Sequence, residues 1–217
     1  MLYRVLRPAV FASVFLLGTF RAEATEPKLV IGVYNTARVP LEALDAAFVL
    51  AHDAFGAAGL ETEWRIRDGG PPGPPDDLVL WILPGRSRGV GSPCALGAAW
   101  FEKNSSRALR AEVFYGAVLE QTQTAHQSVM LLSNVIAHEV GHLLLGRAHS
   151  TRGLMLANWS SPTEFAQRAM LRFDPGEVKR LRALAVQLRT DAALRTGTAR
   201  GAPDSGPLEN DEKRTSR

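Results

Sequence analysis

Three of the chain's five histidines lie within twelve residues, and two of them belong to a pattern that suits a metal site. His138, Glu139 and His142 form a His-Glu-x-x-His motif. On a helix, residues four apart lie one turn apart on the same face, so both imidazoles can hold one metal ion. Glu139 follows the first histidine, where its carboxylate can reach a water on the metal rather than the metal itself. The motif therefore predicts a zinc hydrolase with Glu139 as general base.

The residues around the motif predict the helix that would position it. An apolar run without Pro or Gly, residues 129–137, leads directly into the motif, and three leucines continue it to Gly146. Apolar residues recur here at spacings of three and four, as on the buried face of a helix. They are Leu132, Val135, Ile136, Val140 and Leu143. We expect a buried helix that presents both histidines toward a cleft and ends near Gly146.

The residues that follow carry a resemblance to a known group. A glycine after the motif, a third histidine and a nearby methionine resemble the metzincin clan of zinc peptidases, and residues 137–159 resemble small exported bacterial proteins of that type. The resemblance implies that Gly146 ends the helix, that His149 is the third zinc ligand, and that Met155 is the Met-turn residue. It also implies an α+β fold, with a twisted mixed sheet of about four to five strands on two long helices and a mainly helical part after the Met-turn.

The spacing of the third histidine departs from that clan. Leu145 stands where the clan has its glycine, so the pattern reads HExxHxxxGxxH. One more helical residue turns the chain exit by about 100° and advances it by about 1.5 Å. Glu164 is therefore a rival third ligand, as in gluzincins, although Ser161 and Glu164 also read as a helix capping box. We favour His149 and keep Glu164 as the alternative.

The first 24 residues have the pattern of a secretory signal peptide. Arg4 and Arg7 precede an apolar run at 8–20, and Ala22 and Ala24 flank a cleavage site of the A-x-A type. We expect export to the periplasm or the extracellular space, with no membrane contact after cleavage. Residues 25–190 then form one metallopeptidase-like catalytic domain, and residues 191–217, poor in large apolar side chains, form a disordered tail.

The charge balance gives no support for nucleic-acid binding, and we expect no nucleic-acid partner. The whole chain has 25 basic and 22 acidic residues. The leader contains three arginines and one glutamate, so the rest carries 22 basic and 21 acidic residues. No basic patch with interleaved aromatic residues stands out. Cys94 is the single cysteine, so the exported protein must fold without an internal disulfide.

Hydrophobic periodicity predicts the remaining elements. The predicted strands are 29–34, 61–67, 78–83, 97–101 and 111–115, and the predicted helices are 40–59, 162–171 and 175–189. Gly/Pro-rich loops occupy 69–75 and 84–96, and 116–127 bridges into the motif helix. In metzincins an edge strand pairs with the extended substrate, and the resemblance gives this role to 97–101 or to 111–115.

These features predict an exported zinc-dependent peptidase. His138, His142 and His149 would bind Zn²⁺, and a metal-activated water would attack a peptide or protein substrate with Glu139 as general base. Two alternatives stay open. One is a catalytically inactive exported module that binds metal or a partner, and the other is a zinc hydrolase that acts on a non-peptide amide. The oligomeric state and the substrate sequence are not predicted.

Overall fold

The structure is a computed structural model of the whole chain. It describes residues 28–67, 76–90, 92, 94–103, 108–157 and 171–199. The predicted signal peptide, the loop at 69–75, Glu164 and nearly all of the predicted helix at 162–171 lie outside the described residues.

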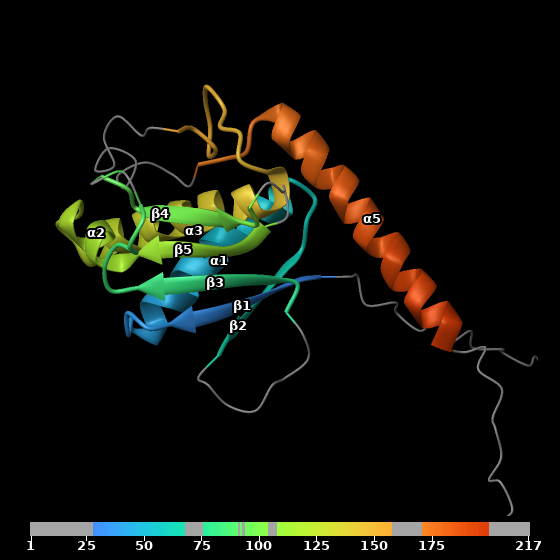
Figure 1. Cartoon of the computed structure of the whole chain (residues 1–217), viewed down its shortest axis with the longest axis horizontal. Coiled ribbons are helices and arrows are strands. Elements are labelled where there is room, and N and C mark those ends of the chain that lie inside the picture. Colours follow the sequence, from blue (N-terminus) through green and yellow to red (C-terminus); the bar gives the residue numbers. More distant parts are fainter. Residues whose placement is uncertain are drawn as a thin grey trace, which may run out of the picture.

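A five-stranded mixed sheet forms the centre of the fold (Figure 1). Its strands are β1 (Leu29–Asn35), β2 (Thr62–Ile66), β3 (Leu78–Leu83), β4 (Gly97–Phe101) and β5 (Ala108–Phe114). They lie in the order β2-β1-β3-β5-β4. The strands β2, β1, β3 and β5 are parallel, and β4 runs antiparallel to β5 at one edge. This antiparallel edge strand is the part of the sheet that borders the candidate site.

Two long helices lie on one face of the sheet (Figure 1). They are α1 (Leu41–Ala57) and α3 (Ala125–Leu145). A short helix, α2 (Tyr115–Glu120), follows β5, and α5 (Pro175–Ala199) follows the described part of the chain at 171–174. The mixed α+β class and the five-stranded sheet agree with the sequence-based prediction.

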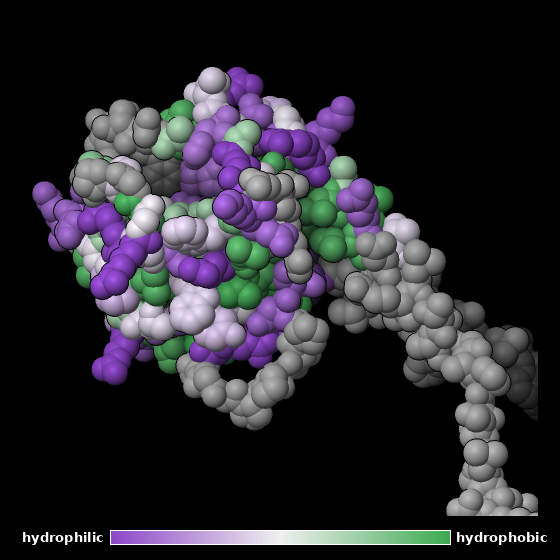
Figure 2. All heavy atoms as spheres, viewed as in Figure 1, coloured by the Kyte–Doolittle hydropathy of each residue, from purple (hydrophilic) through white to green (hydrophobic). Residues whose placement is uncertain are grey.

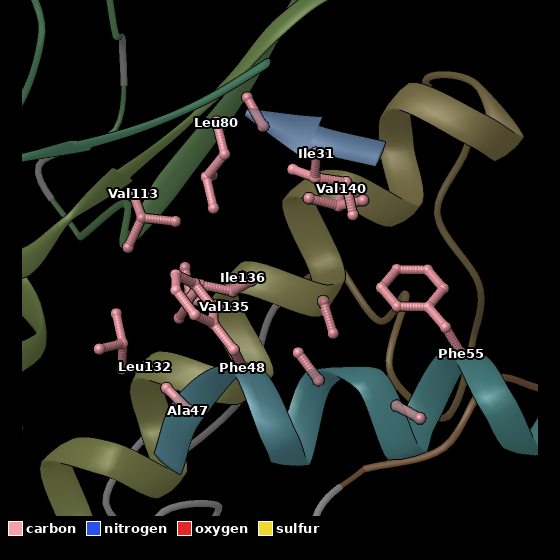
Figure 3. Close-up of a cluster of buried hydrophobic side chains, with 14 of the residues drawn as sticks. Ile31, Ala47, Phe48, Phe55, Leu80, Val113, Leu132, Val135, Ile136 and Val140 are labelled. Carbon is pink, nitrogen blue, oxygen red and sulfur yellow. The ribbon is translucent and has the colours of Figure 1, made fainter. Parts of the chain in front are cut away.

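The core forms because side chains along a strand point alternately to the two faces of the sheet, and because the helices are amphipathic. Every second residue of the central strands is buried toward α1 and α3, for example Ile31, Leu80 and Val113. Figure 3 shows these side chains directed at the apolar faces of the two helices. The helix residues that they meet there are Ala47, Phe48, Phe55, Leu132, Val135, Ile136 and Val140.

Helix α3 owes its apolar character to this burial. It is long and apolar enough to cross a membrane by length and composition, but 78% of that window is buried inside the domain. The face of the molecule that shows the strands mixes hydrophilic and hydrophobic residues, with hydrophilic ones prominent (Figure 2). A core helix therefore explains the composition of α3 without a membrane.

The structure corrects several element boundaries. Residues 115–120 form helix α2, whereas the sequence predicted a strand that ends at 115 and a bridge from 116, because Gly116 at the second helical position hides the helical pattern. Strand β5 begins three residues before the predicted start at Ala111. Helix α5 continues to Ala199, ten residues past its predicted end. The division of the chain into a domain to 190 and a tail from 191 stays a prediction. Residues 200–217 lie outside the described residues.

Two leucines on α1 provide a matched test of this core. Leu44 is fully buried, whereas Leu41 is 57% exposed one turn earlier. We expect Leu44→Ala to lower the free energy of unfolding by about 2–5 kcal/mol, because it removes buried methyl groups and leaves a cavity. Leu41→Ala should change it by less than about 1 kcal/mol. Denaturant unfolding measures both, and equal losses in the two variants would contradict the packing described here.

Candidate metal centre

Helix α3 has a defined start and a defined end, and these set where its histidines lie. Thr124 caps the first turn: its side chain accepts from the backbone of Gln127, and the Gln127 side chain accepts in return from the backbone of Thr124. The helix ends at Leu145, and Gly146 follows with a φ of 90°. That conformation strains any residue with a Cβ, so glycine lets the chain leave the helix sharply here.

Three histidines meet beside the last turns of α3. The Nε2 atom of His142 lies 3.1 Å from Nε2 of His138 and 3.1 Å from Nε2 of His149. One ligand atom from each residue lies within 4.8 Å of the other two. His138 and His142 are buried, while His149 is exposed. The extra residue at Leu145 thus prolongs the helix, and the loop after Gly146 still brings His149 to the pair.

Hydrogen bonds show which nitrogen of the two helical histidines carries the proton. Nδ1 of His138 lies 2.7 Å from the carbonyl oxygen of Leu154, and Nδ1 of His142 lies 2.9 Å from that of Gly146. A carbonyl can only accept, so Nδ1 donates in both neutral rings and Nε2 carries the lone pair. The close Nε2 atoms of His138 and His142 therefore cannot hydrogen-bond to each other in this state. Lone pairs that face a common point suit a shared cation.

Burial keeps these imidazoles neutral. Desolvation is the main cause that lowers the pKa of His138 to about 4, and the nearby His142 and His149 lower it further. The pKa of His142 is also lowered, again mainly by desolvation. Only a neutral imidazole can offer its lone pair to a metal. The site therefore holds these two side chains in the form that binds metal at neutral pH.

The segment after His149 packs under α3. Met155 is buried, and a Cβ on Gly141 would lie 2.6 Å from its Sδ atom. The glycine at this position thus lets the methionine approach the helix. The backbone N–H of Ser150 donates to the carbonyl of Met155, which closes the turn between them.

Contacts with the start of α5 hold the same loop in place. The Ser150 hydroxyl donates to the carboxylate of Glu177, a side chain that is only 2% exposed. The backbone N–H of Asp174 donates to the other oxygen of Glu177, and the Glu177 N–H donates to the Asp174 carboxylate, so the two residues form a capping box at this helix start. The N–H of Leu154 donates to the carbonyl of Arg172. The His149 loop is therefore tied to α5.

Glu139 lies beside the histidines against the edge strand. It is 7% exposed, and a Cβ on Gly97 would lie 2.6 Å from its Cγ atom and 2.7 Å from Oε1. The glycine at the start of β4 therefore leaves the space that the carboxyl group occupies. Desolvation by burial raises the pKa of Glu139 to about 8. A buried carboxyl with a strongly raised pKa, next to a cluster of neutral histidines, is typical of a catalytic site.

These side chains line a cavity with a volume of about 660 Å³. One wall comes from the three histidines and Glu139. The facing wall is the edge strand β4 together with the chain just before it. The lining residues from that wall are Ser92, Cys94, Ala95, Leu96, Gly97, Ala98, Ala99 and Phe101. The cavity is therefore a cleft between the helix that carries the motif and the edge of the sheet.

The structure brings together all four of the predicted polar site residues, and Met155 lies close to them. Sequence reasoning missed the carbonyls of Gly146 and Leu154, because backbone acceptors carry no residue signature. It also missed Gly97 and Arg147, which line the same cleft. Glu164, the rival third ligand, lies outside the described residues.

Comparison with known proteins supports the fold. No family model matches the sequence, and no curated protein matches it. Among solved structures, the fold is similar to that of an archaemetzincin from Methanopyrus kandleri, with a TM-score of 0.56 and 14% sequence identity. The match covers 75% of this chain and 98% of that chain. The described residues therefore form a mixed α+β fold similar to that of this archaemetzincin, with a three-histidine cluster.

Burial of Glu139 predicts how the stability of the metal-free protein depends on pH. An ordinary glutamate has a pKa of 4.5, whereas that of Glu139 is about 8, so between these values the folded state binds more protons than the unfolded state. Stability then falls as pH rises. The lowered pKa of His138 acts in the opposite direction, but only below about 6.5. We expect a loss of up to about 2 kcal/mol between pH 6.5 and 8.

Denaturant unfolding in the presence of a chelator measures this slope. Glu139→Gln should remove it, because the amide does not titrate. Glu42→Gln, which changes an exposed carboxyl on α1, should keep the wild-type slope. The same slope in wild type and Glu139→Gln would show that Glu139 is not the buried group responsible.

Proposed function

We propose that this chain is an exported zinc-dependent peptidase, with His138, His142 and His149 as the zinc ligands and Glu139 as the general base. The observation that carries the proposal is the convergence of three imidazoles whose helical members are locked with Nε2 unprotonated. The similar fold of an archaemetzincin supports the assignment to a metzincin-like class.

The donor set fits zinc. Zinc binds imidazole nitrogen at about 2.0–2.1 Å, which places two tetrahedral nitrogen ligands about 3.3 Å apart. The two Nε2 separations of 3.1 Å are close to that value. Three protein ligands with one further position open are typical of catalytic zinc, whereas structural zinc has four protein ligands. Met155 would pack beneath this centre as the Met-turn residue without binding the metal.

The protein groups then account for hydrolysis. Zinc, when bound, supplies a Lewis acid that lowers the pKa of a water toward about 7 and polarises the scissile carbonyl. The positive charge of a bound metal ion would favour the ionised form of Glu139, so the carboxylate could accept a proton from the attacking water. Glu139 then passes that proton to the leaving amine. The hydrogen bonds to Leu154 and Gly146 keep His138 and His142 in one orientation throughout.

The edge strand suggests how a peptide would bind. β5 pairs with strands on both sides, whereas β4 pairs with β5 alone among the described strands. Ala98, Ala99 and Phe101 of β4 line the cleft that holds the histidines. An extended peptide can therefore add to the outer edge of β4 by backbone hydrogen bonds and cross the site. The sequence left the role of substrate-binding strand open between 97–101 and 111–115, and we assign it to β4, the strand at 97–101.

Export is the part of the proposal that rests on sequence alone. The basic start, the apolar run at 8–20 and the A-x-A pattern support a cleaved leader. The single cysteine and the nearly balanced charge of the remaining chain are compatible with a folded exported domain.

Metal analysis combined with peptide cleavage tests the function. We expect about one zinc per chain in the wild type, and cleavage of some members of a peptide library. Glu139→Ala should keep the zinc but lower kcat/KM by about 100-fold to 10,000-fold, the usual contribution of a general base. His149→Ala should weaken zinc binding by at least about 100-fold, since even loss of a ligand's supporting contact costs 10- to 100-fold.

His126→Ala is the matched control, because His126 is an exposed histidine on α3 outside the cluster. It should leave zinc affinity and cleavage unchanged. If the wild type binds zinc but cleaves no peptide, the peptidase proposal is wrong. The chain would then be a metal-binding module or a hydrolase of non-peptide amides. Zinc affinity that survives His149→Ala and collapses in Glu164→Ala would overturn the ligand set.

A further inference from the structure

One basic side chain in the cleft has no place in the proposed hydrolysis. Arg147 lies in the loop between Gly146 and His149 and lines the cavity. Its guanidinium carbon lies 4.7 Å from the centroid of the Phe101 ring, and Nη2 donates to the carbonyl of Glu102 at 3.4 Å. The arginine is thus anchored at the end of β4.

The positive charge of Arg147 differs from the rest of the cavity lining. Arg147 is the single Arg or Lys among the described residues that line the cavity, and Glu139 is the single carboxylate there. The two charges lie at different ends of the edge strand, because Glu139 contacts Gly97 and Arg147 contacts Phe101. Most of the wall between them is small and apolar, as in Ala98 and Ala99. Such a wall offers little selectivity for polar side chains, so a charged substrate group would be recognised mainly at Arg147.

Its position over the Phe101 ring suits Arg147 to bind a carboxylate. A guanidinium over an aromatic ring is attracted by the ring face, and it has five N–H donors in its own plane. Two of these can donate in parallel to the two oxygens of one carboxylate. Because the ring and the Glu102 carbonyl hold the side chain in place, less conformational entropy is lost when such a ligand binds.

We propose that Arg147 makes this site select peptides that carry an acidic side chain on one side of the scissile bond. The inference rests on the proposed function and names its substrate class. A peptide added to β4 pairs with it residue by residue. The substrate residue opposite Phe101 is therefore four positions from the residue opposite Gly97, beside Glu139. The acidic side chain should lie within about four residues of the scissile bond.

Binding to an inactive variant tests this selectivity apart from catalysis. The probes are blocked decapeptides in which a single Glu moves along a Gly-Ala-Leu background, each paired with its Gln counterpart. Zinc-loaded Glu139→Gln should bind the best Glu peptide about tenfold more tightly than the Gln counterpart, as for a partly exposed charge-assisted contact. Adding Arg147→Gln should remove the difference. Equal affinities in Glu139→Gln, or a difference that survives Arg147→Gln, would overturn the inference.

Cleavage of the same peptides by the active chain gives the second readout. We expect kcat/KM to favour Glu at one position and Arg147→Glu to shift that preference to Lys, a reversal that mere structural damage would not produce. Arg88→Gln removes an exposed charge from the loop after β3, outside the lining residues, and should keep the wild-type preference. Cleavage without acidic preference would refute the role of Arg147 alone, whereas absence of any cleavage would refute the proposed peptidase.

Discussion

The candidate site depends on two hydrogen bonds that orient imidazole rings. His138 donates from Nδ1 to the carbonyl of Leu154, and His142 donates from Nδ1 to that of Gly146. Without these acceptors either ring nitrogen could carry the proton, and the Nε2 lone pairs would not have to face one another. Both acceptors belong to the chain that follows α3. The orientation of the two imidazoles therefore depends on where the helix ends and on the path of the loop that follows it.

Local features of the chain set the path of this loop and the positions of Met155 and Glu139. Gly146 adopts a positive φ, which lets the backbone turn where the helix has one residue more than the clan's usual pattern. Gly141 lets Met155 approach the helix, and Gly97 leaves room for Glu139. Glu177 holds the loop at Ser150. The cost of burying His138, Glu139 and His142 is visible in their shifted pKa values, and the well-packed sheet and helices around them offset it.

The sequence predicted best those elements whose apolar residues are buried in a regular pattern. The bounds of β3 and β4 follow from short apolar runs between loops, and the motif helix follows from a long apolar stripe that ends at glycine. Prediction was weaker at α2, where Gly116 hides a short helix. It could not supply the contact of Gly97 with Glu139 or the position of Arg147, because both depend on how an edge strand and a helix meet. Whether His149 reaches the pair also depended on the loop, and spacing alone left that open.

The central claim is that three imidazole nitrogens from this loop and helix hold one zinc ion. X-ray absorption spectroscopy of the zinc-loaded full chain tests it most directly. We predict a first shell of nitrogen and oxygen atoms at about 2.0–2.1 Å, with outer-shell scattering that fits three imidazole rings. The His149→Ala variant should show two rings. A wild-type spectrum with two imidazoles and a carboxylate, unchanged in His149→Ala, would contradict the account.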